Sequence, residues 1–340
     1  MENTENMKNW DGTKVFITGA DGFIGSHLAD ALVRRGAVVT ALAQYNSFDS
    51  HGWLDGLEAD VRGSMSLVRG DVRDPDQMRA VIGGHEVVFH LAALIAIPFS
   101  YQAPGNYVQT NVQGTVNVLQ AARDGGAARV VHTSTSEVYG SAIFTPITED
   151  HPLRGQSPYS ASKIGADMMA ESFQRSFGLP VVTLRPFNTY GPRQSERAVI
   201  STVIRQALDD ECDALSLGDL SPSRDFNYVT DAVEAFIKTA ELGDQHLGKT
   251  FNAGSGRMIA IAEVVEMVGE ITGCSKPVIE EESRKRPPDS EVLALMADSS
   301  RLRDAAGWMP AVGLAEGLGK TIAWWRGRMD KLRPSAGYIV

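Results

Sequence analysis

The chain alternates short, continuously hydrophobic runs with longer stretches in which apolar residues recur every three or four positions. The first run, residues 15–18, leads into a glycine-rich turn, after which Ile24, Leu28 and Leu32 follow at helical spacing. A second hydrophobic run, in "GAVVTALA", completes a predicted strand–helix–strand unit. Comparable hydrophobic runs recur along the chain in "SLVRGDV", "EVVFHLAA", "RVVHTSTS", "PVVTLRPFN" and "KTFNAGS".

The hydrophobicity of these runs is continuous and does not alternate, which is typical of strands buried on both faces of a parallel sheet. The sequence therefore predicts an α/β fold with a doubly wound parallel sheet. After residue 190 the pattern loosens, but "DAVEAFIKTAE" and "KTFNAGS" again read as a helix and a strand of the sheet. We expect a main unit over residues 13–190, to which 228–255 return, and a smaller interleaved lobe over 191–227 and 256–330.

Composition narrows the class of protein. The chain has 340 residues, 43% of them hydrophobic, and a formal net charge of −10, which argues against a general nucleic-acid binder. Its two cysteines, Cys212 and Cys274, lie far apart and lack metal-ligand spacing, so we expect neither a disulfide framework nor a metal site. The polar N-terminal text resembles no signal peptide, and no apolar run approaches the roughly 18 residues of a membrane span. We expect a cytoplasmic protein.

The glycine-rich turn has the form G-x-x-G-x-x-G, with Gly19, Gly22 and Gly25 between the first strand and the helix that Phe23 and Ile24 begin. Residues without Cβ let the backbone approach a pyrophosphate, and the helix N-terminus offers free N–H groups and a positive dipole. In this strand–turn–helix context the turn predicts that residues 13–190 form a dinucleotide-binding Rossmann domain.

The end of the second strand leaves the dinucleotide undecided between NAD and NADP. An acidic residue there would hold the adenosine ribose and repel a 2′-phosphate, but the position is Ala43, followed by Gln44 and Tyr45. No arginine follows to bind a phosphate either. At the end of the third strand, Asp71 and Val72 are candidates to flank the adenine; the alternative for Asp71 is a plain turn or capping aspartate.

Several ordered motifs together resemble the extended short-chain dehydrogenase/reductases that act on nucleotide sugars. These motifs are "TGADGFIGSHL", "HLAA", "TSTSEVYG", "YSASK", "RPFNTYGP", "RDFNYVTDA" and "DSSRLRDAAGW". The resemblance implies a tightly bound NAD or NADP that is regenerated in each cycle, with Leu91, Ala92 and Ala93 along it. It also implies a nucleotide-sugar substrate and a homodimer formed through helices around residues 106–123 and 159–177.

Tyr159 and Lys163 are four residues apart and share one face of a predicted helix. A nearby ammonium group favours the phenolate, so Tyr159 could accept a proton from a sugar hydroxyl, and Thr135 at a strand end could hydrogen-bond the same hydroxyl. The alternative is that both are incidental surface residues. A dinucleotide-sensing regulator without catalysis is a further alternative, but such proteins tend to lack the tyrosine–lysine pair.

Glu137 indicates the reaction. A carboxylate beside the sugar can act as a base for the carbon next to a newly formed ketone, which the resemblance to nucleotide-sugar 4,6-dehydratases implies; the alternative is a glutamate paired in the core. Ser136 stands where many such enzymes carry an aspartic acid, so we expect Glu137 or a water to help protonate the leaving hydroxyl. The same motif is compatible with nucleotide-sugar decarboxylases, and the cofactor site with 4-epimerases.

Two loops resemble those of bacterial GDP-N-acetylglucosamine 4,6-dehydratases of legionaminic acid biosynthesis. They are "YNSFDSHGWLD" and "HLAALIAIPFSYQAP". This resemblance implies GDP-N-acetylglucosamine as the substrate.

Four further residues are candidates for binding the nucleotide part of the substrate, because amide groups and guanidinium forks suit phosphate and ribose oxygens. They are Asn188, Arg197, Arg224 and Arg286. For Arg224 the alternative is a salt bridge with a neighbouring aspartate, and for Arg286 a solvated charge cluster.

Overall fold

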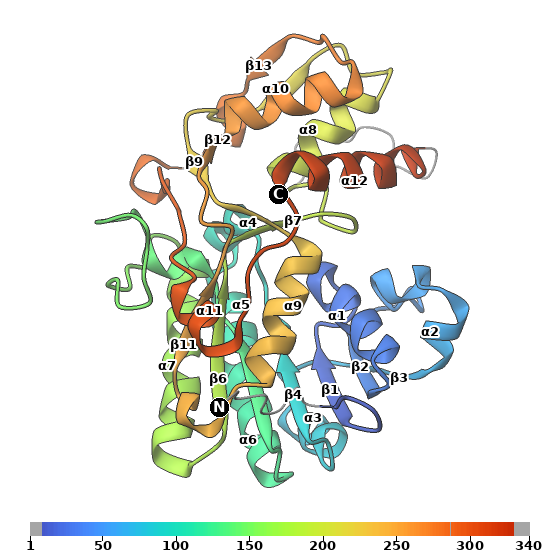
Figure 1. Cartoon of the computed structure of the whole chain (residues 1–340), viewed down its shortest axis with the longest axis vertical. Coiled ribbons are helices and arrows are strands. Elements are labelled where there is room, and N and C mark those ends of the chain that lie inside the picture. The colour runs from blue at the N-terminus through green and yellow to red at the C-terminus, as the bar shows by residue number, and fades with distance from the viewer. Residues whose placement is uncertain (1–8, 286, 330–340) are drawn as a thin grey trace, which may run out of the picture.

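The computed structural model describes residues 9–285 and 287–329, which build a central sheet and a smaller group of elements above it (Figure 1). The sheet has seven parallel strands in the order β11-β6-β5-β4-β1-β2-β3, so the predicted doubly wound parallel sheet is confirmed. The strand order reverses between β1 and β4. Its strands are β1 (Lys14–Thr18), β2 (Val38–Gln44), β3 (Met65–Gly70), β4 (Val87–His90), β5 (Arg129–Thr133), β6 (Val181–Pro186) and β11 (Thr250–Ala253).

Helices cover both faces of this sheet because the strands are apolar on both sides. One hydrophobic core lies between the sheet and α1 (Phe23–Arg34), α9 (Val229–Ala240) and α11 (Ser300–Ala306). The other core lies under α3 (Pro75–Ile82), α6 (Gly114–Asp124) and α7 (Pro158–Phe177). Smaller elements fill the connections: η1 (Gly52–Gly56), α2 (Ala59–Gly63), α4 (Ile97–Gln102), α5 (Pro104–Tyr107), η2 (Val108–Gln113), η3 (Ser136–Tyr139) and η4 (Asp244–His246).

A third hydrophobic core holds the smaller group of elements together. It joins α8 (Val199–Leu208), α10 (Ile261–Thr272) and α12 (Leu314–Arg326), and Trp325 is buried in it. Short strand pairs complete this part: β7 (Asn188–Tyr190) with β10 (Phe226–Tyr228), β9 (Ser223–Arg224) with β12 (Ile259–Ala260), and β8 (Leu215–Leu217) with β13 (Val278–Glu280). Two 3-10 turns, η5 (Glu282–Arg284) and η6 (Pro288–Ser290), follow β13.

The chain passes between the two parts more than once. β11 pairs with β6 at the edge of the sheet, and α9 packs against the sheet, whereas the segments before and after them contribute to the third core. The exact boundaries expected from the sequence stay a prediction.

Among the described residues, no helix combines the length and the apolar character that a membrane crossing requires.

Candidate active site

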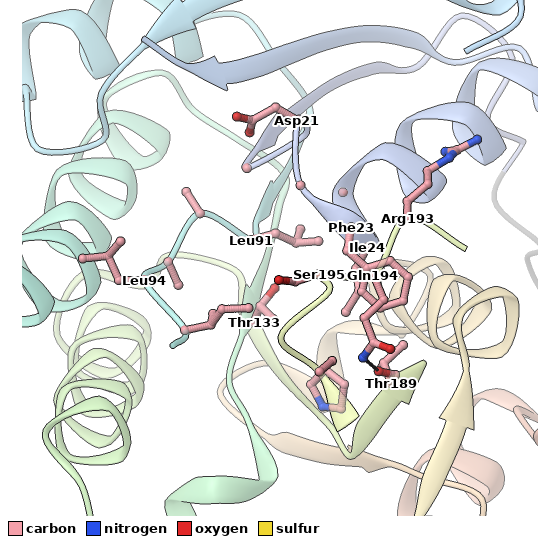
Figure 2. A pocket seen from close by; sticks show the side chains of 18 of the residues that line it. Asp21, Phe23, Ile24, Leu91, Leu94, Thr133, Thr189, Arg193, Gln194 and Ser195 are labelled. Carbon is pink, nitrogen blue, oxygen red and sulfur yellow. Dashed lines mark hydrogen bonds between the residues drawn. The ribbon is translucent and has the colours of Figure 1, made fainter. Parts of the chain in front are cut away.

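A cavity of about 1140 Å³ lies at the carboxyl ends of the strands, between the sheet and the smaller part (Figure 2). Pockets for one small ligand are commonly roughly 300 to 1,000 Å³, so this cavity has room for two ligands end to end. It lies where ligands bind in open α/β sheets, outside the strand ends near a reversal of strand order.

The glycine turn forms one wall of this cavity, and each predicted member of it, Gly19, Gly22, Phe23, Ile24 and Gly25, lines the space. A Cβ on Gly25 would lie 2.1 Å from the carbonyl oxygen of Gly19, and one on Gly19 would lie 2.8 Å from the amide nitrogen of Ala92. Gly19 also has a φ of +66°, which favours glycine. No side chain caps the N-terminus of α1 at Gly22, so its N–H groups are available to an anion. The turn therefore fits a dinucleotide pyrophosphate.

The other predicted cofactor residues, Asp71, Val72, Leu91, Ala92 and Ala93, line the same cavity. The carboxylate of Asp71 is paired with Arg73 at 2.5 Å, and the hydrogen bond from that guanidinium holds the pKa of Asp71 below its usual value. The side chain of Asp71 thus behaves as the alternative interpretation expected, as an aspartate with a local partner. Its contact with an adenine stays a prediction.

The strand end at β4 is held by buried side chains behind the cavity wall. The hydroxyl of Thr18 accepts hydrogen bonds from the N–H groups of Leu91 and Ala92, both at 3.1 Å. His90 lies 2.8 Å from Thr18 through Nδ1 and 3.0 Å from Thr115 through Nε2. Burial lowers the pKa of His90 well below its usual value, so this ring supports the backbone as a neutral group.

The five residues singled out as catalytic candidates come from two elements and meet in one place. Thr135 caps the short helix η3 after β5, where its hydroxyl accepts the N–H of Glu137 at 3.2 Å. Tyr159 and Lys163 lie on α7, which begins at a capping box of Ser157 and Ser160. The cavity is lined by Thr135, Ser136, Glu137, Tyr159 and Lys163.

Tyr159 is hydrogen-bonded to the hydroxyl of Thr135, as the sequence interpretation requires for two groups acting on one sugar hydroxyl. Burial raises the pKa of the Tyr159 phenol, the Thr135 hydrogen bond opposes this, and the charge of Glu137 adds to it. The carboxylate of Glu137 is therefore close enough to act on the phenol electrostatically. Without a further cation the phenol stays protonated.

Lys163 points toward the end of β5, where its Nζ donates a 2.6 Å hydrogen bond to the main-chain oxygen of Thr133. Burial lowers the pKa of Lys163 to about 8. The expectation that Lys163 favours the phenolate form of Tyr159 stays a prediction.

A buried polar cluster behind these residues was not predicted from the sequence. Asp167, one turn after Lys163 on α7, accepts hydrogen bonds from Ser134 at 2.6 Å and from Arg185 at 3.0 Å, and lies 3.0 Å from His132 Nε2. Burial alone would raise the pKa of Asp167, but the His132 hydrogen bond and the Arg185 charge lower it to about 2. The i, i+4 spacing from Lys163 was the one sequence signal for this carboxylate.

The residues predicted to bind the nucleotide part of the substrate separate into three groups. Asn188 and Arg197 line the cavity. Arg224 is buried outside its lining and donates a 2.9 Å hydrogen bond to Glu291, so its salt bridge is with a glutamate distant in the chain and not with a neighbouring aspartate. Arg286 lies outside the described residues.

Other residues of the cavity wall were missed or read differently. Arg193 lines the cavity and reaches α1, where it donates to Ser26 Oγ at 3.3 Å (Figure 2). Trp324 lines the cavity and packs edge-on against Trp53. Arg205 lines it as well. Nothing in the helical spacing of these residues indicates a site, because their positions depend on how the two parts pack.

No group of three or more possible metal-ligating side chains occurs within residues 9–285 and 287–329.

Comparisons with known proteins agree with this arrangement. Residues 16–321 match the family described as GDP-mannose 4,6 dehydratase. The UDP-glucose 4-epimerase of Mycolicibacterium smegmatis is 32% identical over 93% of this chain and 99% of its own. The UDP-N-acetyl-alpha-D-glucosaminuronate decarboxylase of Bacillus cytotoxicus is 33% identical over 92% of this chain and 98% of its own.

A solved structure extends the match to three dimensions. The crystal structure of DesIV, the dTDP-glucose 4,6-dehydratase of Streptomyces venezuelae with NAD and TYD bound, superposes with a TM-score of 0.84. It is 30% identical, and the match covers 93% of this chain and 98% of that one. With the glycine turn, the tyrosine–lysine pair and the strand-end hydroxyl in one cavity, the chain belongs to the GDP-mannose 4,6 dehydratase family, among the extended short-chain dehydrogenase/reductases that act on nucleotide sugars.

Proposed function

We propose that this protein is a nucleotide-sugar 4,6-dehydratase that converts GDP-N-acetylglucosamine into its 4-keto-6-deoxy product. The observation that carries the proposal is the meeting of Thr135, Glu137 and Tyr159 in the cavity that also contains the glycine turn. An epimerase needs groups only for the hydroxyl that it oxidises. A dehydratase also needs a base for the neighbouring carbon, and Glu137 supplies one.

In the first step the phenolate form of Tyr159, which the positive charge of a bound oxidised nicotinamide would favour, accepts the proton of the C4 hydroxyl. Thr135 holds the tyrosine oxygen and the sugar oxygen in line. A nicotinamide dinucleotide held along Gly19, Gly22 and Gly25 would supply the hydride acceptor for C4 and the hydride donor for C6. Lys163 keeps a positive charge beside this end of the cavity, because its pKa of about 8 leaves it largely protonated at neutral pH. The product of the step is a ketone at C4.

In the second step Glu137 removes the proton from C5, which the adjacent ketone has made acidic. The C5 electrons form a double bond to C6, and the C6 hydroxyl leaves as water after it receives a proton. Glu137, protonated by the preceding transfer, returns that proton, directly or through a water held by Ser136. Hydride addition at C6 then completes the 4-keto-6-deoxy sugar together with a proton added at C5. That proton is the equivalent that Tyr159 took from the C4 hydroxyl, passed on through water or Glu137, so atoms and electrons balance.

The wall beyond the glycine turn supports a charged substrate. Arg197 and Arg205 line this part of the cavity together with Asn188, and guanidinium groups suit the paired oxygens of a diphosphate. The preference for a GDP-linked amino sugar rests on the two loops whose sequences resemble those of GDP-N-acetylglucosamine dehydratases. Both contribute to the wall, through Gly52 and Trp53 from one loop and residues 91–95 and 97 from the other.

The experiment is to incubate the purified protein separately with GDP-N-acetylglucosamine, GDP-mannose, dTDP-glucose, UDP-N-acetylglucosamine and UDP-glucuronate, and to identify products by mass spectrometry and NMR. Loss of one water from GDP-N-acetylglucosamine, with a higher kcat/KM than for the other sugars, is expected. Release of carbon dioxide from UDP-glucuronate would instead identify a decarboxylase, and inversion at C4 without loss of mass an epimerase.

The role of Glu137 has its own test. Glu137→Gln is expected to oxidise C4 but not to eliminate water, so reduced nicotinamide accumulates and its absorbance rises when the substrate is added. Tyr159→Phe is expected to show no such rise. Glu211→Gln, which alters an exposed carboxylate outside the cavity wall, is the control and should turn over normally. Normal dehydration by Glu137→Gln would remove this residue from the mechanism.

A further inference from the structure

The end of β2 contains no acidic residue, yet the structure brings a carboxylate to it from the glycine turn. Asp21 lies between Gly19 and Gly22, and its Oδ2 accepts a 3.1 Å hydrogen bond from the N–H of Gln44, the last residue of β2. Its side chain lines the cavity at this point (Figure 2). The acid that the sequence lacks after the second strand is thus supplied by a residue 23 positions earlier.

The position matters because the ribose of a dinucleotide's adenosine lies at the end of the second strand of such folds. A carboxylate there accepts hydrogen bonds from the 2′- and 3′-hydroxyls and repels a 2′-phosphate. We propose that Asp21 holds the adenosine ribose and makes this protein specific for NAD over NADP. The proposal deepens the proposed function by naming its cofactor, and it rests on the dinucleotide site alone.

A purely structural role for Asp21 would be to hold the end of β2 against the turn. The main chain already makes such contacts: the N–H of Trp53 donates to the Asp21 carbonyl at 3.0 Å, and the N–H of Ala20 to that of Leu42 at 3.2 Å. Within the described part of the chain, the Asp21 carboxylate accepts hydrogen bonds from two groups, the N–H of Gln44 and its own N–H. The remaining acceptor positions of the carboxylate are therefore available to ribose hydroxyls.

Because the Asp21 carboxylate is largely buried, its repulsion of a nearby negative charge is less screened by water than that of an exposed carboxylate. Burial raises the pKa of Asp21, while the N–H groups of Gln44 and of Asp21 itself, and the nearby His51, favour the ionised form. A second negative charge placed at hydrogen-bond range would be repelled through a medium less polar than water.

Three arginines lie near this end of the cavity, and two of them are paired with carboxylates. Arg69, beside Ala43 in the β2–β3 register, pairs with Asp49 at 2.5 Å and is not part of the cavity wall. Arg73 pairs with Asp71, and Arg328 lies over the rings of Trp53 and Trp324. A 2′-phosphate would thus meet the Asp21 carboxylate, and Arg328 is the one of these three arginines that lines the cavity.

The test measures which dinucleotide the protein holds, without using turnover. Purified holoenzyme is equilibrated with an excess of NAD and NADP in equal amounts, separated from free nucleotide, and denatured, and the released dinucleotides are quantified by mass spectrometry. Wild type is expected to release NAD at least tenfold over NADP. Asp21→Asn, which retains an oxygen for the Gln44 N–H, is expected to lower that ratio at least tenfold.

Two further variants complete the design. Asp21→Ser should shift the ratio in the same direction, and it replaces Asp21→Asn if that variant fails to fold. Asp60→Asn removes an exposed carboxylate outside the cavity wall and should leave the wild-type ratio unchanged. Equal release of both dinucleotides by wild type, or an unaltered ratio in both Asp21 variants, would overturn the inference. Such a result leaves the proposed reaction intact, whereas release of neither dinucleotide would contradict both.

Discussion

Lys163 on α7 donates a 2.6 Å hydrogen bond to the main-chain oxygen of Thr133 at the end of β5. The bond joins the helix that carries Tyr159 to the strand that leads to Thr135, so the two reacting hydroxyls are held in register by a third side chain. The Lys163 ammonium group is buried in this position. Burial disfavours its charged form and lowers the pKa of Lys163 from 10.5 to about 8.

The lowered pKa of Lys163 predicts that the stability difference between wild type and Lys163→Met depends on pH. Between pH 8 and 10.5 the unfolded chain keeps the Lys163 proton that the folded protein has lost, so rising pH stabilises wild type. The difference between the two pKa values corresponds to about 3 kcal/mol. Urea unfolding at pH 7 and near pH 10 should show the free energy of wild type rising relative to the variant by a large part of this amount. A constant gap would show that Lys163 is not buried as a cation. The variant should also be inactive.

How much of this site the sequence could predict depended on whether the partners are neighbours in the chain. Tyr159 and Lys163 share a helix face, and Gly19, Gly22 and Gly25 share a turn, so spacing alone placed them. The strand-end position of Thr135 followed from the hydrophobic run before it. These predictions needed only local geometry and the rule that parallel strands end at one edge.

Residues whose partners are distant were beyond the reach of spacing. Asp167, Ser134 and Arg185 meet because β5 and β6 pair and α7 packs on them, which no local pattern encodes. The carboxylate of Asp21 reaches β2 only through the path of the glycine turn, so its absence from β2 was read as an absence from the site. Arg224 was expected to bind the nucleotide part of the substrate, with a salt bridge to Asp225 or Asp231 as the alternative, but in the structure it donates to Glu291.

The buried cluster around Asp167 predicts a large stability loss in Asp167→Asn. The substitution leaves the guanidinium of Arg185, which is also buried, without its countercharge. Breaking one partner of a buried pair costs about 3 to 5 kcal/mol. Urea unfolding at pH 7 measures this directly. Asp150→Asn, whose carboxylate is 82% exposed and pairs with Arg301, is the control and should cost about 1 kcal/mol or less. Equal effects of the two substitutions would contradict the assigned role of the cluster.

The close approach at Gly25 predicts that Gly25→Ala loses its dinucleotide. The added methyl group would lie 2.1 Å from the Gly19 carbonyl and 2.9 Å from Ala20 Cα, so the start of α1 must move away from the turn. We expect at least a tenfold smaller amount of copurified dinucleotide per protein, measured after denaturation. Gly63→Ala, where nothing lies within 4 Å of the added group, should retain the wild-type amount. Full retention by Gly25→Ala would show that the turn can adapt.

The expected homodimer stays a prediction, and α7 offers a direct way to test it. Met168 and Met169 are exposed on this helix, and Val108 is exposed on η2, which packs beside α7. Long apolar side chains in adjacent exposed positions are costly in water, and a second copy of the chain would cover them.

Wild type should therefore have twice the chain mass by light scattering after gel filtration. Met168→Glu with Met169→Glu should shift it towards the mass of one chain, because a dimer would bury the new charges. Met309→Glu, at an exposed methionine of another region, should leave the mass unchanged. A wild-type mass of one chain at every concentration would refute the dimer.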